Sequence, residues 1–202
     1  MPKLFAQFLS YLFHPALMPL AGFGLLMYLH PYPIESGVLI YTLSFLVLGT
    51  YIMPGFISVL FVKMGLIDSL HMRDAESRRW PFLVAVVFYV FTALYLKVFP
   101  IPQETPRYLL GAAAGIGTLI ILLPILKASA HMAGIGGFLA LVYYLGEAYQ
   151  VDLYTVFLAA VLCSGVVASA RLALGAHDMN ELIIGFLCGF SGVLSVMMWF
   201  QF

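Results

Sequence analysis

The stretch Leu153–Glu181 reads LYTVFLAAVLCSGVVASARLALGAHDMNE and joins an apolar run to a polar turn. Its first part, Leu153–Leu174, supplies the roughly 20 mainly apolar residues that are needed to cross the hydrocarbon core of a bilayer. In lipid, a continuous run of this kind can satisfy its backbone hydrogen bonds only as a helix. The stretch therefore predicts a transmembrane helix that ends beside ionisable residues.

The rest of the chain repeats this pattern. Of its 202 residues, 63% are hydrophobic and only 9% are charged, whereas about a quarter of the residues in a soluble domain are charged. Further apolar runs lie near residues 9–29, 37–62, 82–99, 108–126, 132–149 and 182–202. Histidine and prolines interrupt the first of these runs, so its first half can also be an interfacial helix. We expect one integral-membrane domain, residues 1–202, forming an all-α transmembrane bundle of six to seven spans.

The charges and cysteines exclude several classes of protein. Lys plus Arg and Asp plus Glu are equal at nine each, so nothing indicates a nucleic-acid partner. Cys163 and Cys188 both lie inside apolar runs, where neither a disulfide framework nor a cysteine metal site is expected. We expect membrane lipids as partners, and neither a metal nor another cofactor. The oligomeric state cannot be derived from the residues.

Three polar breaks follow the second, fourth and sixth apolar runs. They are Lys63–Trp80, Lys127–His131 and Ala170–Glu181. Two crossings separate each break from the next, so all three are predicted to emerge on the same side of the membrane. Ionisable residues this close to hydrocarbon are costly, which makes them functional candidates. The three breaks can therefore form a single site.

The pooled residues indicate an anion pocket. The candidates are Arg73, Arg78, Arg79, Lys127, Ser129, His131, Arg171, His177 and Glu181. Arginine's planar fork suits phosphate. If the segment after His177 is helical, Glu181 lies one turn away and its carboxylate can orient the imidazole. One histidine can attack phosphorus while the other protonates the departing alkoxide, so a phosphoester can be cleaved through a phosphohistidine without a metal.

These residues resemble the type 2 phosphatidic acid phosphatase superfamily, whose pattern is Lys-x6-Arg-Pro, then Pro-Ser-Gly-His, then Ser-Arg-x5-His-x3-Asp. The third motif is matched by Ala170-Arg171, five residues, His177, three residues and Glu181. Its spacing is intact, with Ala in place of Ser and Glu in place of Asp. The longer Glu181 side chain can weaken the orienting hydrogen bond.

The other two motifs match less closely. The second resembles Ala128-Ser129-Ala130-His131, which keeps the Ser and the His. For the first, Arg78 or Arg79 lies near Pro81, but no lysine stands seven residues before either, so Arg73 is the substitute.

The resemblance implies a role for each matched residue. His177 would be the nucleophile, Glu181 its orienting partner and His131 the general acid. The phosphate ligands would be Ser129, Arg171 and Arg78, and we also expect Arg73, Arg79 and Lys127 to be phosphate-binding. The implied activity is that of a metal-independent lipid phosphate phosphatase. Its substrate would be a polyprenyl phosphate or diphosphate, a phosphatidic acid or a phosphatidylglycerol phosphate.

The resemblance also favours an outward-facing site in a bacterial cytoplasmic membrane. The distribution of Lys and Arg decides nothing about orientation, because most of the cations on the motif side are the proposed phosphate ligands.

Other interpretations remain open. Asp178 and Glu181 match a capping box, Ser129 can cap a helix, and Arg171 and Lys127 can extend from span ends towards water. To His14 and His30, which stand beside prolines, we assign no chemistry. The same pocket also suits a lipid phosphotransferase, in which an alcohol receives the phosphoryl group. A non-catalytic protein that binds or transports anionic lipid is the third alternative.

Overall fold

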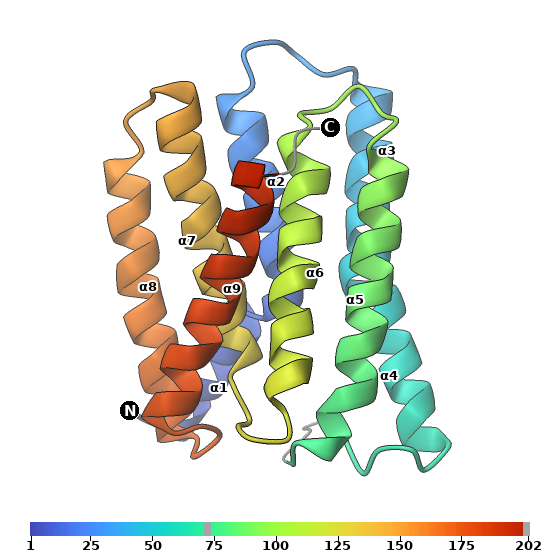
Figure 1. Ribbon diagram of the computed structural model, residues 1–202, viewed down its shortest axis with the longest axis vertical. Coiled ribbons are helices and arrows are strands. Elements are labelled where there is room, and N and C mark those ends of the chain that lie inside the picture. Colours follow the sequence, from blue (N-terminus) through green and yellow to red (C-terminus); the bar gives the residue numbers. More distant parts are fainter. Residues whose placement is uncertain (71–73, 200–202) are drawn as a thin grey trace.

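The protein is described by a computed structural model that covers residues 1–70 and 74–199. In this part of the chain every regular element is helical (Figure 1). The elements are α1 (Lys3–Leu12), η1 (Pro15–Leu17), α2 (Met18–Leu29), α3 (Ser36–Val47), η2 (Leu48–Ile52), α4 (Met53–Lys63), α5 (Glu76–Leu96), α6 (Glu104–Leu122), α7 (Ala130–Tyr149), α8 (Tyr154–Ala173) and α9 (Met179–Trp199). This confirms the predicted all-α bundle.

Six helical segments of the described chain are long and apolar enough to cross a membrane. They are Lys3–Leu29, Ser36–Lys63, Glu76–Leu96, Glu104–Leu122, Tyr154–Ala173 and Met179–Trp199. The protein is therefore an integral membrane protein with six candidate spans. The seventh predicted run corresponds to α7, which is rich in glycine and packs against α6, α8 and α9. Because half of α7 is buried by its neighbours, it needs fewer lipid-facing apolar side chains than the other helices.

The first apolar run forms two helices rather than one. Helix α1 ends at Leu12, and the short 3-10 turn η1 begins at Pro15, where a proline is well tolerated because its missing N–H needs no partner. The residue between them, His14, accepts a hydrogen bond at Nδ1 from the Ala16 N–H, at 3.3 Å. The break between α1 and α2 therefore fixes the position of a histidine ring.

The second run contains a wide π-helical turn, η2. It ends just before Pro54, whose lack of an N–H removes a normal helical hydrogen bond one turn earlier. Within η2 the Thr50 hydroxyl lies 2.7 Å from the Leu46 carbonyl and 3.5 Å from the carbonyl of Ala16 in η1. The two irregular turns therefore meet inside the bundle.

Glycines allow α9 to pack closely against α7. A Cβ added to Gly189 would collide with the backbone of Ala133, and one on Gly136 would collide with the carbonyl of Phe186. Small residues at helix contacts allow this kind of approach between membrane helices. The contact places the start of α9 against the start of α7.

The three predicted polar breaks lie at one end of the bundle. Figure 1 shows the α4–α5, α6–α7 and α8–α9 connections at the same end as the N-terminus, and the α2–α3, α5–α6 and α7–α8 connections at the other. Segments far apart in the sequence are thus brought to one membrane face.

Candidate active site

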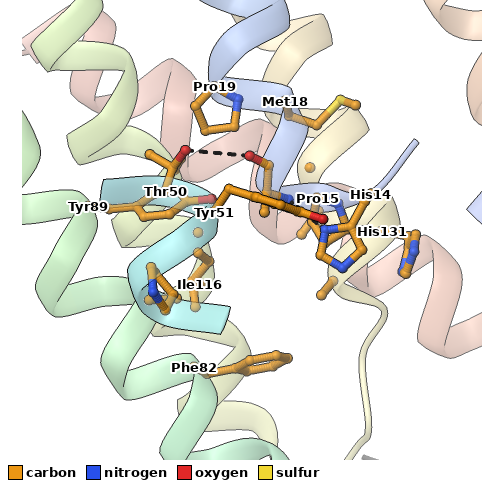
Figure 2. Close-up of a pocket in the computed structure, with 18 of the residues that line it drawn as sticks. His14, Pro15, Met18, Pro19, Thr50, Tyr51, Phe82, Tyr89, Ile116 and His131 are labelled. Atoms are coloured by element: carbon orange, nitrogen blue, oxygen red, sulfur yellow. Dashed lines mark hydrogen bonds between the residues drawn. The ribbon is translucent and has the colours of Figure 1, made fainter. Parts of the chain in front are cut away.

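A cavity of about 660 Å³ lies between the helices, and residues near the polar breaks form part of its lining. The imidazole and guanidinium groups that line it come from different parts of the chain, namely His14, Arg78, His131, Arg171 and His177. The structure therefore brings both predicted histidines and two of the predicted arginines to one cavity. Figure 2 shows part of this lining.

His177 is oriented by Glu181 one helical turn away. The distance from His177 Nδ1 to Glu181 Oε2 is 2.8 Å, and the side chain of His177 is only 1% exposed. A carboxylate can only accept a hydrogen bond, so Nδ1 is the protonated nitrogen and Nε2 has the lone pair. His177 can therefore act as a nucleophile through Nε2.

The same carboxylate also caps α9. Glu181 Oε2 accepts a hydrogen bond from the Asp178 N–H at 3.2 Å, and Asp178 Oδ1 accepts one from the Glu181 N–H at 2.8 Å. This is the reciprocal pattern of a capping box, which confirms that interpretation of the sequence. The helix start thus fixes the carboxylate that orients His177.

The surroundings of His177 keep its imidazole neutral. Burial is the main cause, and the positive charge of Arg78 acts in the same direction, so the pKa falls from 6.5 to about 4 although the hydrogen bond to Glu181 opposes the shift. At neutral pH the lone pair on Nε2 is therefore available.

A buried arginine on α5 and a half-buried arginine on α8 line the cavity. Arg78 is 7% exposed, and its Nη1 donates to the Ala128 carbonyl at 3.3 Å. Arg171 donates from Nη1 to the Ser10 hydroxyl at 3.3 Å, while its buried Nε has no acceptor among the described residues. A buried N–H without a partner is costly. The Arg171 guanidinium is therefore suited to an anionic ligand in the cavity.

His131 contacts the end of α1. Its Nε2 lies 3.1 Å from the Ser10 carbonyl oxygen, which can only accept a hydrogen bond. The Nε2 atom of His131 is therefore protonated, and Nδ1 is left for proton exchange.

Of the other predicted phosphate-binding residues that the structure describes, Ser129, Arg79 and Lys127 do not line the cavity. Ser129 is fully buried and caps α7, since its Oγ accepts from the Met132 N–H at 3.4 Å, while its own N–H donates to the Glu181 carbonyl. Arg79 is exposed and lies 6.0 Å from the Trp80 ring centroid, and Lys127 is half-buried. Arg73 lies outside the described residues.

The sequence analysis missed His14. Its ring centroid lies 5.7 Å from that of His131, with the two rings nearly perpendicular, and both line the cavity (Figure 2). In the sequence, the only signal was a polar residue inside an apolar run, which membrane proteins rarely place without a function.

Away from the charged groups the cavity is apolar and extends between the helices. Met18, Tyr89, Ile116 and Val193 contribute to this part of the lining. The wall formed by η2 and α4 includes the partly exposed side chains of Tyr51, Ile52, Phe56 and Val59. The cavity thus joins a cationic end to an apolar interior.

Comparisons with models of known protein families, with curated proteins and with solved structures found no match for this chain.

Proposed function

We propose that this protein is a metal-independent lipid phosphate phosphatase that acts through a phosphohistidine. The observation that supports it best is the convergence of four side chains on one cavity from α5, α7, α8 and the α8–α9 connection, namely Arg78, His131, Arg171 and His177. Two imidazoles provide a nucleophile and a general acid, and two guanidinium groups provide the charge that binds a phosphoryl group.

In the first step, His177 Nε2 attacks the phosphorus atom and the bond from phosphorus to the lipid oxygen breaks. The imidazolium form of His131, stabilised by the bound phosphate dianion, gives its Nδ1 proton to that oxygen, and the lipid alcohol leaves. From a diphosphate, the leaving group is the lipid monophosphate. The phosphorylated His177 ring is positively charged, and the Glu181 carboxylate at 2.8 Å from Nδ1 stabilises it.

In the second step, water attacks the phosphohistidine. His131 Nδ1 accepts a proton from the water, the bond between phosphorus and His177 Nε2 breaks, and inorganic phosphate is released. Arg78 and Arg171 stabilise the negative charge on the phosphoryl oxygens in both steps. Before inorganic phosphate leaves, the complex has the same protonation state as the substrate complex, with His131 protonated and His177 neutral.

The apolar part of the cavity favours a lipid as the substrate. A phosphate at the cationic end would leave the hydrocarbon chain in contact with side chains such as Tyr89 and Val193. Apolar walls discriminate weakly between chains that differ by a few methylene groups. Polyprenyl phosphates or diphosphates, phosphatidic acid and phosphatidylglycerol phosphate are all proposed substrates, and we propose that the site faces outward from a bacterial cytoplasmic membrane.

The decisive experiment measures phosphate release from a panel of these lipids, using the wild type and His177→Ala in detergent. We expect release by the wild type from at least one lipid and none above background from the variant. A phosphorylated alcohol in place of free phosphate would identify a phosphotransferase. Binding of the lipids without any turnover would identify a non-catalytic binding or transport protein.

A further inference from the structure

We propose that His14 is a third imidazole of this site and that its Nε2–H donates a hydrogen bond to a phosphate oxygen of the substrate. The inference rests on the proposed function and adds a ligand to the same site. His14 lies outside the three motifs.

The position of His14 is determined by the break between α1 and η1. Its ring lies at the cavity wall, with centroids 5.7 Å from His131 and 6.2 Å from Tyr51, and both contacts are edge-to-face (Figure 2). The following residues, Pro15 and Ala16, line the cavity as well. The ring is therefore held beside the proposed general acid by packing on two sides.

The hydrogen bonds of His14 determine its tautomer. Nδ1 accepts from the backbone N–H of Ala16 at 3.3 Å, and a backbone N–H can only donate. In the neutral ring the proton is therefore on Nε2. Among the described residues, none accepts a hydrogen bond from this N–H, although the ring lines the same cavity as Arg78 and Arg171.

A neutral donor is well suited to this place. Arg78 and Arg171 already contribute two positive charges to the cavity, and a third fixed cation would repel them. An uncharged N–H adds a hydrogen bond to an anionic oxygen without that repulsion, and such charge-assisted bonds are among the strong ones in proteins. Together the two guanidinium groups and His14 Nε2–H can bind several phosphate oxygens.

The competing explanation is that His14 only caps η1, and a pair of substitutions separates the two. In His14→Asn, the side-chain oxygen can still accept from the Ala16 N–H, because asparagine is a good N-cap, but nothing replaces Nε2–H. In His14→Gln, the longer amide can reach the position of Nε2–H, but the cap is weakened.

The test measures phosphate release and the affinity for inorganic phosphate, by calorimetric titration in detergent, for the wild type and both variants. We expect His14→Asn to keep the thermal stability of the wild type while both quantities fall by about 10- to 100-fold, the range for one hydrogen bond to a charged group. His14→Gln should lose less than His14→Asn in both assays.

Wild-type values for a folded His14→Asn would overturn the role of His14. If His14→Asn fails to fold, the His14→Gln variant tests the proposal instead. Glutamine can replace the proposed hydrogen bond, so a folded His14→Gln that no longer binds phosphate would contradict it. An active wild type with an unaffected His14→Asn overturns only this inference. A wild type that releases no phosphate from any lipid overturns the proposed function, and the affinity for inorganic phosphate then still tests His14.

Discussion

The Nε2 atom of His131 lies 3.1 Å from the carbonyl oxygen of Ser10, a residue 121 positions earlier in the chain. The hydroxyl of the same Ser10 lies 3.3 Å from Arg171 Nη1. One residue at the end of α1 therefore orients a proposed general acid through its backbone and a proposed phosphate ligand through its side chain. The two functions can be separated by mutation.

Ser10→Ala removes the contact with Arg171 and leaves the carbonyl that orients His131. We expect KM for the lipid phosphate to rise by about tenfold, the effect of losing one hydrogen bond to a charged group, while kcat changes little. Steady-state kinetics in detergent provide the measurement. The control is Ser191→Ala on the exposed side of α9, whose hydroxyl bonds only to carbonyls of its own helix. A large fall in kcat with unchanged KM would contradict this division of roles.

Glu181→Gln should reduce kcat more than KM. The amide is nearly the same size as the carboxylate and can still bond to His177 Nδ1, but it cannot stabilise the positive charge that develops on the ring. We expect kcat to fall by about 100-fold or more, within the range for groups that assist proton transfer and charge development. Rapid-quench detection of the phosphohistidine should show slower formation. The Gln side chain also keeps a helix cap, so unchanged thermal stability is the control.

His177 should stay neutral well below pH 6.5, because burial and Arg78 lower its pKa to about 4. In ¹⁵N spectra of the histidine rings, one neutral ring with its proton on Nδ1 should persist at pH 5 and should disappear in His177→Gln. The folded pKa lies below that of the unfolded chain. Protonation therefore favours unfolding, and the contribution of His177 to stability is lost progressively as the pH falls from about 6.5 towards 4. A ring that titrates near pH 6.5 would contradict this environment.

Phosphate release should continue in excess EDTA. In the proposed mechanism Arg78 and Arg171 stabilise the transferring phosphoryl group, a task that metal ions perform in other phosphotransfer enzymes. The rate in EDTA should therefore match the rate before chelation. Loss of activity that returns on adding a divalent cation would replace this mechanism with a metal-dependent one.

Much of the architecture could be predicted because membrane spans have a strong local signal. The apolar runs gave the all-helical bundle, and counting crossings from Lys63–Trp80 to Ala170–Glu181 predicted that the polar breaks would meet at one end. The contact between His177 and Glu181 could also be predicted, because it depends only on their i, i+4 spacing. In each case the relevant physics depends on neighbours in the sequence.

The features of the site that the sequence did not predict depend on contacts between distant segments of the chain. The sequence left open whether Ser129 faces the cavity or caps a helix, and the structure shows the cap; nor could the motif spacing show that Arg79 lies beside the Trp80 ring. His14 reaches the cavity only because α1 breaks before Pro15 and packs against α8. Such placements follow from tertiary packing, which a single sequence does not display.

Glycines mark the contact between α7 and α9 that positions the site. A larger residue at Gly189 would meet the backbone of Ala133, which cannot move as a flexible side chain can. Gly189→Leu should therefore separate α9 from α7 and destabilise the protein by at least about 1–3 kcal/mol, the usual cost of overpacking. Gly165→Leu on α8 is the matched control, because nothing lies within 4 Å of an added Cβ there. Thermal unfolding in detergent should show a lower midpoint for Gly189→Leu and little change for Gly165→Leu. Because α9 begins beside His177, phosphate release should fall at temperatures where the Gly189→Leu variant is still folded. Equal midpoints for the two variants would show that the α7–α9 contact is looser than its geometry implies.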